Sequence, residues 1–108
     1  MTSLQGKKLT LTVRVESGCL GPNGVDVIDD FCRLAQKEFE SFYANFIHWQ
    51  IVPRHDVALP EMSYYIDNKK LDSAKATKYL TLFDQDIASI ETELEEKLAA
   101  LINVYLGY

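Results

Sequence analysis

One segment limits the possible folds more than any other, because apolar and polar residues alternate in it without a break. In residues 8–16, the apolar Leu9, Leu11, Val13 and Val15 are separated by single polar residues. Successive side chains of a β-strand point to opposite faces, so the alternation predicts a strand with one buried and one solvent-facing side. A sheet buried on one face is typical of antiparallel strands with helices packed on that face.

Residues 25–45 predict an amphipathic helix. Its apolar stripe recurs at steps of three and four: Ile28, Cys32, Ala35, Phe39, Phe42 and Phe46. Charged residues fall largely on the other side, as expected for a helix that buries one face. We expect this face, widened by Phe31, to pack against the apolar face of the first strand.

Three further strands are predicted after this helix. Residues 46–52 read FIHWQIV, rich in β-branched and aromatic side chains, and Pro53 ends the run. Residues 62–67 predict the next strand. The dipeptide Asp67-Asn68 then predicts a tight hairpin turn into a short strand at residues 69–71.

The remainder of the chain returns to helical spacing. We expect a short helix near residues 73–83, a bend, and a long helix near residues 85–106, with Gly107 as its C-terminal cap. Asp84 and Asp86 are the candidate N-caps. A competing interpretation makes residues 79–83 (YLTLF) a strand.

The predicted order of elements is β-α-β-β-(β)-α. It predicts an α+β two-layer sandwich, with a three- to four-stranded antiparallel sheet and two main helices on one face. The 108 residues predict a single domain, residues 1–108, with residues 1–6 as a loose N-terminal tail.

Charge and cysteine content limit the function classes. The chain carries 11 basic and 16 acidic residues, a net charge of −5, which argues against a nucleic-acid partner. No apolar run approaches membrane-spanning length, and no signal peptide is evident. Cys19 and Cys32 are too few for a disulfide scaffold, so we expect a reduced, cytoplasmic protein.

The glycine-rich loop at residues 18–24 is the candidate ligand site. The residues that would form it are Gly18, Cys19, Gly21, Asn23 and Gly24. A glycine-rich turn between a strand and a helix can bind an anion through free backbone N–H groups. The spacing matches no established phosphate-binding motif, and a structural turn is the competing interpretation.

The sequence gives little support for a metal site or a catalytic site. His48, His55 and Glu61 do not have the spacing of a recurrent metal site, and no catalytic triad or nucleophile motif is present. We therefore predict no catalytic residues, no metal and no cofactor.

The apolar stripe of the last helix suggests self-association. Its candidate interface residues are Leu94, Leu98, Leu101 and Tyr105. A helix of this length extends beyond what one small sheet can cover, and a two-fold homodimer would bury the remainder. The leading hypothesis is a non-enzymatic interaction or regulatory domain that binds itself or another protein. The alternative is a small enzyme or ligand-binding protein that uses the loop at residues 18–24.

Overall fold

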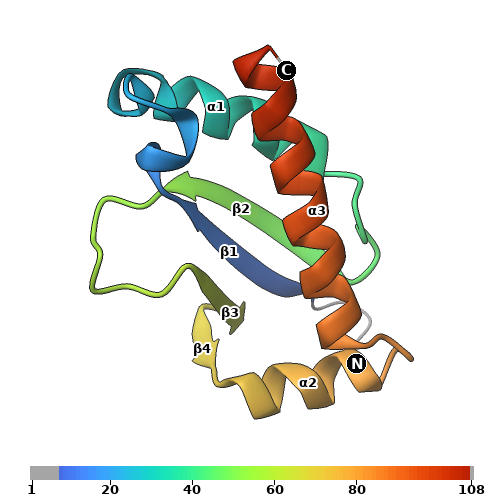
Figure 1. Ribbon diagram of the computed structural model, residues 1–108. Coiled ribbons are helices and arrows are strands. Elements are labelled where there is room, and N and C mark those ends of the chain that lie inside the picture. The colour runs from blue at the N-terminus through green and yellow to red at the C-terminus, as the bar shows by residue number, and fades with distance from the viewer. Residues whose placement is uncertain (1–7, 108) are drawn as a thin grey trace.

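The computed structural model describes residues 8–107, and the predicted N-terminal tail lies outside them. The elements are β1 (Leu9–Val15), the 3₁₀-helix η2 (Ser17–Leu20), α1 (Gly24–Phe39), β2 (Ile47–Pro53), β3 (Met62–Ile66), β4 (Lys69–Leu71), α2 (Ser73–Thr81) and α3 (Ile87–Leu106). A four-stranded sheet forms one layer, and α3 crosses in front of it (Figure 1). The predicted α+β two-layer class is confirmed.

The sheet is mixed, so the prediction of a wholly antiparallel sheet was wrong for one strand pair. The strand order is β2-β1-β3-β4. β1 pairs in parallel with β2, from Leu9 beside Ile47 to Val15 beside Pro53. β3 is antiparallel to both of its neighbours. Parallel pairing requires a long crossover, and α1 supplies it, so β1, α1 and β2 form a β-α-β unit.

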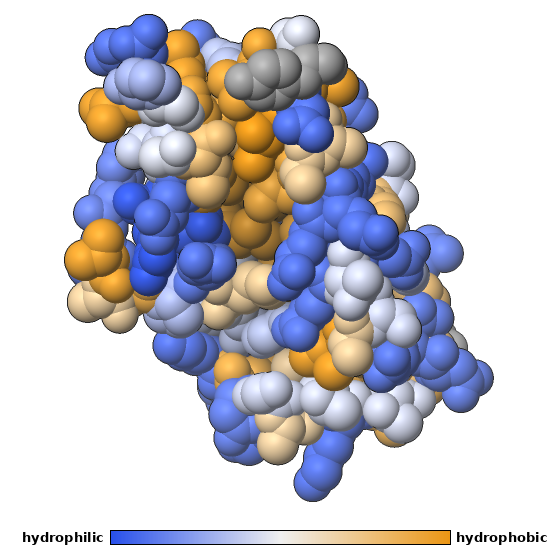
Figure 2. All heavy atoms as spheres, viewed as in Figure 1, coloured by the Kyte–Doolittle hydropathy of each residue, from blue (hydrophilic) through white to orange (hydrophobic). Residues whose placement is uncertain are grey.

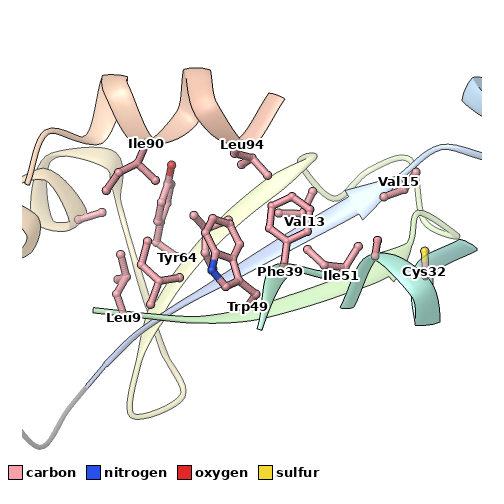
Figure 3. Close-up of a cluster of buried hydrophobic side chains, with 14 of the residues drawn as sticks. Leu9, Val13, Val15, Cys32, Phe39, Trp49, Ile51, Tyr64, Ile90 and Leu94 are labelled. Carbon is pink, nitrogen blue, oxygen red and sulfur yellow. The ribbon is translucent and has the colours of Figure 1, made fainter. Parts of the chain in front are cut away.

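One hydrophobic core joins the sheet to the helices. From the sheet it contains the alternating apolar residues of β1 together with Ile47, Trp49, Ile51 and Tyr64. Ile28, Phe31 and Phe39 of α1 are buried in this core, as predicted, whereas Phe42 is only partly buried. Figure 3 shows Ile90 and Leu94 of α3 pointing toward the sheet from the opposite side of the core.

The first helix ends earlier than the predicted residue 45. After Phe39 the chain makes turns, and Tyr43 adopts a left-handed backbone with a φ of 49°. The carbonyl oxygen of Tyr43 then accepts the N–H of Ile47 at 2.9 Å, which starts β2. Phe42 lies in this turn and still packs on the core, with its ring centre 5.6 Å from that of Trp49.

Residues 79–83 do not form a strand. Tyr79 and Leu80 are buried residues of α2, which Asp72 caps by accepting the N–H of Lys75 at 2.8 Å. Asp86 caps α3 by accepting the N–H of Ser89 at 3.2 Å. Asp84, the other predicted cap, instead makes the bend between the helices with a φ of 57°.

Gly107 is the C-terminal cap of α3, as predicted, and its backbone is left-handed. Within residues 8–107, none of the helices has both the length and the apolar character that crossing a membrane requires.

Candidate interaction surface

The glycine-rich segment is more ordered than the predicted loop. Gly18 and Cys19 belong to η2, and Gly24 is the first residue of α1. Gly21 has a φ of 86°, a left-handed conformation that glycine adopts without strain. A Cβ on Gly24 would lie 1.8 Å from the carbonyl oxygen of Ser17, so only glycine allows η2 to pack against α1. These roles of Gly21 and Gly24 are structural.

A small hollow lies beside this segment, where the parallel strands β1 and β2 end. Its volume is about 200 Å³, and its lining includes Ser17, Val25 and His55 but none of the five predicted loop residues. Arg54, which also lines it, bonds the carboxylate of Glu16 and the carbonyl oxygen of Leu59. The guanidinium of Arg54 therefore stabilises the connection that follows β2. The five predicted loop residues do not line the hollow and form no site there.

The two cysteines lie in different environments. Cys19 is exposed and Cys32 is buried, and both are free thiols. Burial, with a smaller contribution from the charge of Asp29, raises the pKa of Cys32 to about 11. The thiol of Cys32 therefore remains protonated at neutral pH and packs as an apolar group. Residues 8–107 contain no cluster of three or more His, Cys, Asp or Glu side chains that could hold a metal ion.

The sheet face opposite the helices is polar and open. Thr10, Gln50 and Tyr65 line a hollow of about 320 Å³ on it. Arg14, at the same hollow, donates to the Ser63 hydroxyl at 2.8 Å. Interaction with the guanidinium of Arg14, followed by that with Ser63, lowers the pKa of Tyr65. The polar groups of this face largely bond one another across the strands.

The first half of α3 is fastened to the body of the protein. Ile90 and Leu94 are each 1% exposed and lie in the core. The carboxylate of Glu91 accepts the hydroxyl of Tyr64, and that of Glu93 accepts the hydroxyl of Tyr43. The ammonium of Lys97 then lies 5.6 Å from the ring centre of Phe39, within cation–π distance.

The second half of α3 is attached less closely. Its side chains that contact the core are only partly buried: Leu98, Leu101, Ile102 and Tyr105. Tyr105 packs edge-on against Phe31, with ring centres 5.4 Å apart. Val104 is 70% exposed and Leu106 is 37% exposed. These six residues are called here the C-terminal apolar surface.

Of the four predicted interface residues, three belong to this surface and one does not. Leu98, Leu101 and Tyr105 are partly exposed, whereas Leu94 lies in the protein's own core and is corrected here to a core residue. The four predicted interface residues did not include Ile102, which has the helical spacing of the stripe, nor Val104 and Leu106, which do not. The signal that would have found them is charge, because residues 98–107 contain no charged side chain.

An apolar strip is visible at the end of the molecule where α3 ends (Figure 1 and Figure 2). Figure 2 shows apolar side chains gathered beside the chain's C-terminal end, with hydrophilic side chains on both sides of the strip. Six other exposed large apolar residues lie outside α3, in other parts of the chain: Val25, Leu34, Val52, Val57, Leu59 and Leu82. Single exposed apolar residues are ordinary, whereas the last turns of α3 expose all or part of several apolar side chains between Leu98 and Leu106.

Comparisons of the chain with protein-family models, with curated proteins and with solved structures found no match.

Proposed function

We propose that this chain is a non-enzymatic interaction or regulatory domain that self-associates through the C-terminal apolar surface. The observation that supports this is the uncharged end of α3. A helix at a protein's surface normally carries charged or polar residues on its solvent side. Residues 98–107 contain no charged side chain, although Val104 and Leu106 are exposed.

Charge favours a second copy as the partner. The chain has a net charge of −5, so most contacts between two copies would bring like charges together. The uncharged C-terminal apolar surface avoids this repulsion. In a two-fold dimer the same patch meets itself, so apolar residues face apolar residues on both sides.

The shape of the molecule supports the same arrangement. Its principal extents are 49 × 27 × 23 Å. Figure 1 shows the C-terminal end of α3 at the end of the molecule opposite α2. Two copies can therefore meet through these ends (Figure 1).

The proposal includes a reducing, cytoplasmic setting. An exposed thiol such as Cys19 survives unpaired where cellular reductants keep it reduced. The alternative, a ligand-binding or catalytic role for the loop at residues 18–24, is less well supported. Gly24 there is explained by packing, and the neighbouring hollow is lined by other residues.

Sedimentation equilibrium at micromolar concentration tests the proposal with two variants of α3. The wild-type chain should approach twice its 12.3 kDa mass. Val104→Lys should weaken association at least about tenfold, because burying an unpaired ammonium costs more than the ~1.4 kcal/mol that this factor represents. A lysine near a helix C-terminus is favourable for the helix itself, so the variant should still fold.

Thr92→Lys is the matched control, because Thr92 is exposed on the first half of the same helix. This variant should associate like the wild type. A wild-type mass of 12.3 kDa at every concentration, or equal loss of association in both variants, would contradict the proposal.

A further inference from the structure

The free edge of β2 is closed in three different ways along its length. β2 lies at one end of the strand order, so every second residue directs its backbone groups away from the sheet. At the start of β2, the N–H of Ile47 donates to the carbonyl oxygen of Tyr43 at 2.9 Å. At its end stands Pro53, which has no N–H to offer.

Between these positions the edge is closed by a side chain, Gln36 of α1. The Nε2 of Gln36 donates to the carbonyl oxygen of Trp49 at 2.8 Å. Its Oε1 accepts the N–H of Ile51, also at 2.8 Å. A carboxamide carries the same donor and acceptor as a peptide group, so Gln36 occupies the place that the backbone of a neighbouring strand would take.

A groove lies beside this edge, between α1 and the end of β2. Its volume is about 680 Å³. Leu34, Ile51 and Pro53 provide apolar lining, and Gln36 itself lines it. The charged residues around it lie on α1 or, for the last of them, directly after it: Asp29, Arg33, Lys37 and Glu40. Two are acidic and two are basic, so the groove favours a segment without net charge.

We propose that this groove binds an extended, uncharged peptide segment of a partner protein, which adds a strand to β2 while the side chain of Gln36 rotates away. An extended peptide matches the outward carbonyl of Trp49 and the outward N–H of Ile51 with its own backbone groups. Of the three closures, only that by Gln36 is a side chain that can rotate aside without moving the backbone.

A second copy is a less suitable occupant of this edge. Its own β2 edge is closed by its own Gln36, and α1 lies beside it. A free extended segment has neither obstacle. The site is separate from the C-terminal apolar surface, so the two proposals can fail independently.

A titration followed by NMR tests the site. The probe is the peptide acetyl-Lys-Val-Thr-Val-Thr-Glu-amide, which has no net charge, added to ¹⁵N-labelled protein. The Ile51 N–H and the side-chain amide of Gln36 should shift saturably. Gln36→Ala should bind the peptide up to about tenfold more tightly, because no side chain then competes for the edge.

Gln50→Ala is the matched control. Gln50 is on the same strand, but its Oε1 accepts the hydroxyl of Thr12 at 3.0 Å on the open sheet face. This variant should bind the peptide like the wild type. Gln36→Glu, which keeps an acceptor for Ile51 but no donor for Trp49, should bind with intermediate affinity. The same peptide with alternate backbone nitrogens methylated should not bind.

Three results would overturn the proposal. The first is no saturable shift of Ile51 in either the wild type or a folded Gln36 variant, because main-chain pairing tolerates many peptide sequences. The second is equal binding of the methylated peptide. The third is stronger self-association of Gln36→Ala than of the wild type, measured without peptide. That result would make a second copy the occupant of the edge.

Discussion

At the scale of single residues, the glycine-rich segment shows how packing can resemble a ligand motif. Gly18, Gly21 and Gly24 have a regular spacing in the sequence, yet the structure uses two of them for different purposes. Gly21 turns the chain with a positive φ, and Gly24 lets η2 approach the start of α1. A spacing pattern cannot distinguish these demands from phosphate binding, because both require glycine.

Substitution of Gly24 tests this account. Gly24→Ala should lower the free energy of unfolding by about 3 kcal/mol or more, since the added Cβ meets backbone that cannot rotate aside. Gly18→Ala is the control, because a Cβ at Gly18 meets nothing within 4 Å. Urea denaturation should find Gly18→Ala within about 1 kcal/mol of the wild type. Equal stabilities of the two variants would show that η2 does not pack as described.

At the scale of elements, α3 is held to β3 and to the turn after α1 by tyrosine–carboxylate hydrogen bonds. Tyr64 of β3 donates to Glu91, and burial followed by this hydrogen bond raises the pKa of Tyr64 above its ordinary value of 10. The tyrosine therefore keeps its proton in the folded protein at a pH where the unfolded chain loses it. Alkaline pH should loosen the attachment of α3.

The sign of the pH effect follows from proton binding. Above about pH 10 the unfolded chain binds fewer protons than the native one at Tyr64, so the free energy of unfolding falls as pH rises. Tyr64→Phe should reduce this decline in denaturation curves measured from pH 8 to about 11. Tyr65→Phe should not reduce it, because the pKa of Tyr65 is lowered. An unchanged decline in Tyr64→Phe would contradict the burial of the Tyr64 hydroxyl beside Glu91.

Several elements could be predicted from the sequence because their burial pattern is periodic. The alternation of Leu9, Leu11, Val13 and Val15 indicates one buried face whatever the direction of the neighbouring strand. Because the alternation is the same in parallel and antiparallel pairs, it could not show that β1 and β2 are parallel. Likewise Phe42 retains helical spacing although α1 ends at Phe39, because the turn keeps its ring beside Trp49.

The candidate surface could be predicted in part for a related reason. Helical spacing identifies the side of α3 that bears Leu94, Leu98 and Leu101, but it does not indicate where the core beneath the helix ends. In the structure Leu94 is fully covered and Leu98 is not. Gln36 carries no sequence signal, because its role depends on the position of the β2 edge.

At the scale of the whole molecule, the exposed surfaces differ in charge and in apolar content. The chain is acidic, the sheet has one open polar face, and the C-terminal apolar surface lies at one end of an elongated shape (Figure 1). Residues 98–107 carry no charged side chain, so a second copy can approach this end of α3 without meeting a like charge on it. We propose that the protein self-associates through this end.

The most direct measurement is an isotope-filtered NOE experiment on an equimolar mixture of ¹³C-labelled and unlabelled chains. We expect NOEs from the labelled methyl groups of Val104 to protons of Leu98, Leu101 or Leu106 in the unlabelled copy. The exposed methyl groups of Val57 and Leu82 should show none. Absence of intermolecular NOEs to Val104 at millimolar concentration, or their appearance at Val57 or Leu82 instead, would contradict the claim.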